Sequence, residues 1–124
     1  MKLLLDTNIL LWLAAGNLRI TQDFLQTLDE AENVFVSDIS LLEISIKISV
    51  GKLVRPSSFA EVLQKLGTEK LPISSSALDI IEGLPLLHRD PFDRTLVAQA
   101  IAENATLVTG DKQLTEYAVK SILV

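Results

Sequence analysis

Short apolar runs alternate with longer amphipathic segments along the chain. The apolar runs predict five strands, at residues 2–5, 33–36, 71–73, 105–109 and 121–124. The segments with apolar residues at helical spacing predict helices at residues 9–15, 21–31, 39–50, 57–67, 77–82, 91–104 and 112–118. Continuous apolar runs are typical of parallel strands that are covered on both faces. Strands that alternate with helices predict right-handed crossovers, and hence one α/β domain over residues 1–124 with a central, mostly parallel sheet flanked by helices.

Two of the predicted helices have clear end signals. Asp90 places a carboxylate at the N-cap of the helix at 91–104, and Pro91 follows at the first helical position, where no backbone N–H is needed. The helix at 39–50 is capped by Ser37 or Asp38 and stops at Gly51. These signals fix where two helices begin relative to the strands beside them.

Four acidic residues lie near one predicted edge of the sheet. In open parallel sheets, functional sites form beyond the carboxyl ends of the strands, an edge that we call the carboxyl edge. Asp6 follows the first strand, and Asp111 follows the strand at 105–109. Asp93 starts the helix that leads into that strand, and Glu43 lies early in the helix after the second strand. The predicted topology therefore brings all four carboxylates towards the carboxyl edge.

Each acid also has a purely structural explanation. Asp6 and Asp111 could each cap the helix that follows, Glu43 could form a capping box with Ser40, and Asp93 could interact with a helix dipole. For a single acid, such a role is the commoner one.

The set of four favours a metal site. Two of these acids fall within apolar stripes predicted to face the core, Asp93 among Phe92, Leu96, Val97, Ala100 and Ile101, and Glu43 among Ile39, Leu42, Ile46 and Val50. Carboxylates brought close together in such a place repel one another unless a cation is present. Oxygen ligands without histidine or cysteine select Mg²⁺ or Mn²⁺.

The helix at 39–50 carries a second apolar stripe. Leu41, Ile44 and Ile48 lie opposite the predicted core stripe. A helix that is apolar on two sides is either covered within its own domain or forms an interface with another chain. The pattern leaves both alternatives open.

The composition of the chain disfavours several kinds of catalytic site. The chain has no cysteine and a single histidine, His88, which disfavours thiolate nucleophiles and a Ser–His triad. No glycine-rich phosphate-binding motif is present. The net charge of −5, from 16 acids and 11 basic residues, is unusual for a nucleic-acid-binding protein. If four of the acids bind metal, twelve acids remain against 11 basic residues, and the charge is close to neutral. No apolar segment is long enough to span a membrane and no signal-peptide pattern is present, so a cytoplasmic location is expected.

Four segments together resemble the PIN domain, and more closely the toxins of VapBC toxin–antitoxin pairs. These segments are LLLDTN at the start of the chain, LLEIS at 41–45, HRDPFDRTLVAQA at 88–100 and TLVTGD at 106–111. The resemblance covers the whole chain in order and spacing. It implies an endoribonuclease that depends on one or two Mg²⁺ or Mn²⁺ ions, is neutralised by a small antitoxin protein and forms a homodimer.

The resemblance also implies roles for individual residues. The metal-binding acids would be Asp6, Glu43, Asp93 and Asp111, and Asp90 would be structural. Thr109 and Asn8 would support the site, although many close relatives have histidine where this chain has Asn8.

Several other residues have less definite roles. Arg94 is interpreted as a solvated surface residue or an RNA contact, His88 as a residue that holds its loop, and Trp12 as part of the core. Five basic residues form a loose group of candidate RNA contacts without aromatic residues between them: Lys47, Lys52, Arg55, Arg89 and Lys112. The RNA-binding residues are therefore not identified.

Two other classes of function compete with the nuclease. The first is a catalytically inactive PIN-like module used for regulation or dimerisation, which the intact set of acids disfavours. The second is an aspartyl-phosphate enzyme with Asp6 as nucleophile, which is disfavoured because Asn8 stands where such phosphatases have a second aspartate.

Overall fold

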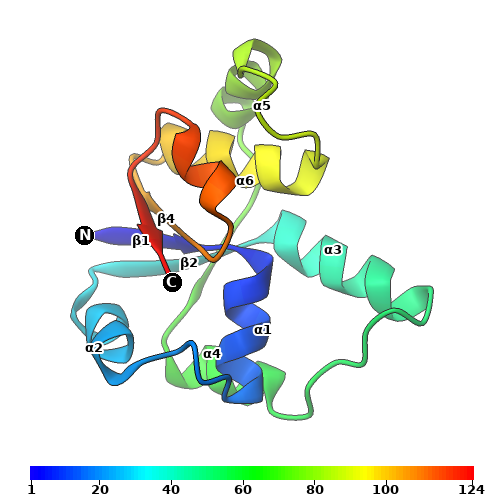
Figure 1. The fold of residues 1–124 in the computed structure, drawn as a ribbon, viewed down its shortest axis with the longest axis vertical. Coiled ribbons are helices and arrows are strands. Elements are labelled where there is room, and N and C mark those ends of the chain that lie inside the picture. Colours follow the sequence, from blue (N-terminus) through cyan, green and yellow to red (C-terminus); the bar gives the residue numbers. More distant parts are fainter.

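The computed structural model describes all residues from 1 to 124 and has a five-stranded, entirely parallel sheet at its centre (Figure 1). The strand order is β3-β2-β1-β4-β5. Their bounds are β1 (Lys2–Leu5), β2 (Asn33–Ser37), β3 (Glu69–Leu71), β4 (Thr106–Thr109) and β5 (Ser121–Leu123). In the centre, Leu4 of β1 pairs in register with Phe35 of β2 and Leu107 of β4. The predicted α/β fold with a central parallel sheet is confirmed.

Six α-helices and one 3₁₀ helix connect the strands. They are α1 (Thr7–Ala15), α2 (Gln22–Glu30), α3 (Asp38–Ser49), α4 (Phe59–Lys65), α5 (Ser75–Gly83), α6 (Pro91–Ala102) and the 3₁₀ helix η1 (Lys112–Glu116). The longest, α3 and α6, have 12 residues each, and no helix of the structure combines the length and apolar character that a membrane span requires.

Most predicted boundaries shift by one or two residues, and two elements show why. Strand β3 begins at Glu69, two residues before the predicted strand, because it is an edge strand with exposed Glu69 and Lys70 and so lacks a continuous apolar run. The segment predicted as a helix at 112–118 forms only a short 3₁₀ helix, in which Leu114 is the one buried residue.

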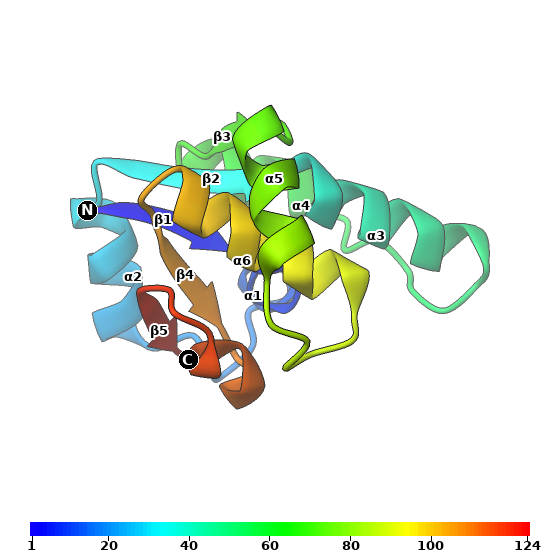
Figure 2. The ribbon, with the colours of Figure 1, turned by 90° about the horizontal axis from the view of Figure 1, so that it is seen from above.

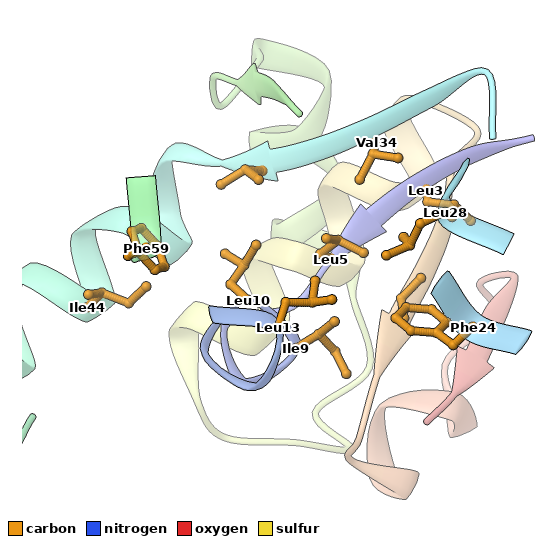
Figure 3. Close-up of a cluster of buried hydrophobic side chains, with 12 residues drawn as sticks. Leu3, Leu5, Ile9, Leu10, Leu13, Phe24, Leu28, Val34, Ile44 and Phe59 are labelled. Carbon is orange, nitrogen blue, oxygen red and sulfur yellow. The ribbon is translucent and has the colours of Figure 1, made fainter. Parts of the chain in front are cut away.

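The sheet separates two apolar layers, and the central strand contributes to both. Leu3 and Leu5 of β1 pack with residues of α1, α2 and α4, whereas Leu4 packs with residues of α6. Figures 1 and 2 show α1 and α2 on one face of the sheet and α6 on the other. Figure 3 shows the first layer, in which Phe24 and Leu28 of α2 and Ile9, Leu10 and Leu13 of α1 close over the strands. This burial on both faces explains why the central strand is apolar at consecutive positions.

Helix α3 extends away from the sheet, and the prediction of its core face is wrong. Leu42, Ile46 and Val50 are exposed by 49%, 42% and 61%, whereas Ile44 is fully buried. Leu41 and Ile48 pack against the same core as Ile44, so the second stripe is covered within the domain. The reason is that α3 extends past the end of the sheet, so that β2, α1 and α6 are its main contacts (Figure 1).

A buried glutamine connects α6 to the carboxyl edge. Gln99 is 1% exposed, and its Oε1 accepts a hydrogen bond of 2.5 Å from Ser37, the N-cap residue of α3. Its amide nitrogen donates to the carbonyl oxygens of Leu71 and Pro72, which follow from β3. Gln99 therefore holds the start of α3 and the end of β3 against α6.

Replacing Gln99 with leucine should lower the free energy of unfolding by about 1–3 kcal/mol, because the buried carbonyl of Leu71, the partly buried carbonyl of Pro72 and the buried hydroxyl of Ser37 would each lose a partner. Urea unfolding followed by circular dichroism measures the change. Gln26 on α2, whose amide bonds only to Glu30 at the surface, offers the matched control Gln26→Leu. Equal stability of the two variants would contradict a structural role for Gln99.

Candidate active site

Asp6 lies where β1 passes into α1 and is 3% exposed. One carboxylate oxygen, Oδ1, accepts a hydrogen bond of 2.9 Å from the backbone N–H of Ile9 and caps α1. The other oxygen, Oδ2, accepts a hydrogen bond of 2.5 Å from the hydroxyl of Thr109 at the end of β4. The capping role and a place in the site are therefore compatible, because they use different oxygens.

Glu43 lies on the inner side of α3 and is 7% exposed. Its Oε1 accepts a hydrogen bond of 2.7 Å from the Thr7 hydroxyl, and its Oε2 lies 2.9 Å from the ammonium group of Lys47. The alternative of a capping box with Ser40 is wrong, because the N-cap of α3 is Ser37. Glu43 instead links α3 to the first turn of α1.

Asp93 and Asp111 approach the site from α6 and from the end of β4. The Nε2 atom of His88 lies 3.1 Å from Oδ2 of Asp111 and 3.6 Å from Oδ2 of Asp93. Asp111 also caps η1, since its Oδ1 accepts from the backbone N–H of Gln113 at 2.9 Å. Asp90 caps α6 as predicted, with its Oδ1 2.8 Å from the backbone nitrogen of Phe92.

The four predicted acids form one connected group. Thr7, next to Asp6, bonds to Glu43, and Thr109 donates to Asp6 while its oxygen accepts from the backbone N–H of Asp111 at 3.0 Å. Asp93 is close enough to Asp6 and Glu43 for their negative charges to raise its pKa. The Thr109 hydroxyl thus connects Asp6 to the backbone of Asp111.

The electrostatics of the group favour a cation. Burial raises the pKa of Asp93 to about 7, and the charges of Asp90, Glu43 and Asp6 add to the rise while His88 opposes it. Burial also raises the pKa of Asp6, although hydrogen bonds from Thr109 and the backbone amides of Ile9 and Gly110 partly compensate. A divalent ion would stabilise the charged form of both carboxylates and so oppose the effects of burial and repulsion on their pKa values.

The raised pKa of Asp93 predicts that the metal-free protein loses stability as the pH rises. Its folded-state pKa of about 7 exceeds the unfolded value of 3.8, so between these values the folded state binds more protons than the unfolded state. The free energy of unfolding should therefore fall, by on the order of 1–3 kcal/mol, between about pH 4 and pH 7. Urea unfolding in EDTA tests this, and the slope should be smaller in Asp93→Asn.

The structure also locates three other residues that the sequence analysis singled out. Asn8 is exposed in the first turn of α1, and its side chain makes no hydrogen bond to the acids. Arg94 is not a free surface residue, because its guanidinium donates to the carbonyls of Leu84 and Pro85 and braces the loop before α6; its role as an RNA contact stays a prediction. Trp12 packs against the core as predicted, although it is only partly buried.

The loose group of basic residues does not converge on the acids. Only Lys47 contacts one of them, through its ion pair with Glu43. Arg55 lies over the ring of Phe59, 5.4 Å from its centroid, and Lys52 and Lys112 are exposed.

His88 is the site residue that the sequence prediction missed. Its assigned role was to hold a loop, yet its ring contacts two of the four acids. The sequence does contain an indication of this role. His88 stands two residues before the N-cap Asp90, a position from which a side chain can fold back over the first turn of the helix.

The donor set fits a divalent ion. His88, Asp93 and Asp111 each offer one atom within 4.8 Å of the others, whereas Asp6 and Glu43 lie outside this group of three and act on Asp93 through their charges. The Asp93 carboxylate accepts no hydrogen bond, since Nε2 of His88 lies 3.6 Å from its Oδ2, too far for a good one. A partly buried carboxylate without a hydrogen-bond donor is suited to coordinate a hard cation.

A family model describes nearly the whole chain. The PIN domain model matches residues 3–120. The chain belongs to the PIN domain family. A comparison with curated protein sequences found no match.

Solved structures show the same PIN fold at low sequence identity. VapBC2 from Rickettsia felis, bound to a promoter DNA fragment, has a TM-score of 0.77 at 22% identity, with 99% of this chain and 98% of that chain covered. DNA-bound VapBC from Salmonella typhimurium has a TM-score of 0.72 at 15% identity, with 98% and 97% covered. FitAcB from Neisseria gonorrhoeae has a TM-score of 0.62 at 18% identity, with 97% and 96% covered.

Proposed function

We propose that this PIN domain is an endoribonuclease that depends on Mg²⁺ or Mn²⁺ and hydrolyses phosphodiester bonds of RNA. The observation that carries the proposal is the connected group of four carboxylates, Asp6, Glu43, Asp93 and Asp111, at the carboxyl edge of a PIN fold. Its charge and burial are unfavourable without a cation.

The four carboxylates would hold one or two ions. A bound ion would supply an activated water and stabilise the charge that builds on the phosphate during in-line displacement. The chain's own part is to fix the ligand oxygens: Thr109 orients Asp6, and Thr7 orients Glu43. Attack by water would leave a 5′-phosphate and a 3′-hydroxyl.

The biological role proposed for the enzyme is that of the toxin in a VapBC-type pair, acting on cytoplasmic RNA. Support comes from the fold shared with VapBC and FitAcB structures. A small antitoxin and a second copy of the chain are the proposed protein partners. Exposed apolar side chains on α3 and α5, namely Leu42, Ile46, Val50 and Leu78, offer surface for such contacts.

Incubation of the purified protein with total RNA tests the activity. Cleavage should require Mg²⁺ or Mn²⁺, stop on addition of EDTA and produce ends with a 5′-phosphate. If no RNA is cut and calorimetry detects no metal binding at millimolar concentrations, the chain would instead be an inactive PIN-like module for regulation or dimerisation.

Expression in a bacterial host tests the toxin role separately. Growth should stop on induction and resume when the product of the neighbouring open reading frame is expressed with it. Harmless expression of a protein that cleaves RNA in the test tube would remove the toxin assignment and leave the nuclease assignment intact.

A further inference from the structure

The imidazole ring of His88 is held in one orientation by its own backbone and its neighbours. The backbone N–H of His88 donates to Oη of Tyr117 at 2.9 Å, and Tyr117 is itself 4% exposed. The Nδ1 atom of the ring lies 3.1 Å from the backbone nitrogen of Asp90. Arg94, which braces the preceding loop through two carbonyls, also reaches Oη of Tyr117 at 3.4 Å. His88 is therefore held both at its backbone N–H and at its ring, and its side chain is 15% exposed.

The contact with Asp90 determines which ring nitrogen carries the proton. A backbone N–H can only donate, so Nδ1 must offer its lone pair to the amide of Asp90. In the neutral ring the proton then belongs to Nε2. This is the nitrogen that lies 3.1 Å from Oδ2 of Asp111, within hydrogen-bond distance, and 3.6 Å from Oδ2 of Asp93, beyond that distance.

A histidine that binds metal has the opposite arrangement. Its ligating nitrogen presents a lone pair to the ion, while the other nitrogen donates its N–H to a carboxylate or a carbonyl. In His88, Nδ1 accepts from the backbone amide of Asp90, and Nε2, which faces the acids, keeps its proton. An Nε2 atom that carries a proton has no lone pair left for a cation.

We propose that His88 is a positioning residue that acts through Asp111 and Asp93 and is not itself a metal ligand. Its Nε2–H holds the Asp111 carboxylate by a hydrogen bond and keeps the neighbouring Asp93 carboxylate on the same side of the ring. The ion of the proposed nuclease site, on which this inference rests, is then bound by carboxylate oxygens alone. An oxygen-only ligand set favours Mg²⁺ and Mn²⁺ over Zn²⁺, for which an imidazole would be a good ligand.

The protonated nitrogen can be identified directly, because His88 is the only histidine of the chain. A long-range ¹H–¹⁵N correlation spectrum of uniformly ¹⁵N-labelled protein at pH 8, where histidine side chains are ordinarily neutral, gives one imidazole pattern. We expect the Nε2–H tautomer without metal and the same tautomer after saturation with Mg²⁺. An Nδ1–H tautomer, or loss of the Nε2 proton on Mg²⁺ binding, would overturn the proposal.

Two substitutions separate positioning from a general effect on the fold. In His88→Gln the amide nitrogen can take the place of Nε2 and still donate to Asp111, whereas in His88→Asn it can reach only the place of Nδ1. By calorimetry, Mn²⁺ affinity should stay within about 3-fold of the parent in His88→Gln and fall about 10- to 100-fold in His88→Asn.

The possible outcomes distinguish this inference from the proposed function. Equal Mn²⁺ affinity of both variants and the parent would overturn the positioning role, even if both variants melt at a lower temperature. An equal loss of affinity in both would indicate that the imidazole binds the ion and would also overturn it. If the parent protein binds no Mn²⁺ and cuts no RNA, the proposed function fails, and the metal-positioning role of His88 fails with it, whichever tautomer is found.

Discussion

Asp93→Asn is expected to abolish metal-dependent RNA cleavage, with a loss in rate on the order of 10³-fold or more. Asp93 lies in the first turn of α6, and burial, together with the negative charges of Asp90, Glu43 and Asp6, raises its pKa to about 7. Asparagine keeps the size of the side chain but removes the charge that a divalent ion would bind. The measurement is the initial rate of cleavage of a labelled RNA at saturating Mg²⁺.

The same substitution should not harm the fold. It removes a buried charge that is unfavourable without metal, so in EDTA at pH 8 the free energy of unfolding should be unchanged or higher than that of the parent. Asp90→Asn is the matched control, because asparagine also caps helices well and this acid lies three residues away on the same turn. Cleavage by Asp93→Asn at the parent rate would exclude Asp93 from the catalytic set.

The HRDPFDR segment shows which parts of the site could be predicted from sequence. Asp90 and Pro91 identify the helix start by local rules alone, and the structure has both in those places. The position of Asp93 near the carboxyl edge followed from helix and strand lengths. Both predictions depend only on local backbone geometry, and the residues of a short segment are enough to predict that geometry.

Long-range packing accounts for most of what could not be predicted. The inner face of α3 was assigned wrongly because both of its stripes are apolar, and only the position of α1 and α6 decides which one is covered. Arg94 bonds to the loop before α6, a contact that depends on the path of residues 84–89. The contacts of His88 depend on the same path.

Gly110 shows a further constraint that the sequence alone does not reveal. It lies between Thr109 and Asp111, and its backbone amide helps to lower the pKa of Asp6. A methyl group on Gly110 would lie 2.8 Å from Cζ3 of Trp12 and closer still to Cη2. The indole of Trp12, with Arg19 over its ring at 4.7 Å from the centroid, therefore packs directly on the backbone that carries two site residues. The glycine is required here by close contact.

Gly110→Ala should consequently lower the free energy of unfolding by about 1–3 kcal/mol and also weaken Mn²⁺ binding, since the indole or the backbone between Thr109 and Asp111 has to move. Trp12 is the only tryptophan, so its fluorescence reports the displacement as well as unfolding in urea. The double variant with Trp12→Leu removes the colliding ring and should be less destabilised than the sum of the two single changes. Gly83→Ala, on α5 where an added methyl meets nothing within 4 Å, is the matched control. Strict additivity of the two changes would show that the indole does not constrain the Thr109–Asp111 backbone, and the geometry of Asp111 would then have to depend on its cap to η1 and its bond to His88 alone.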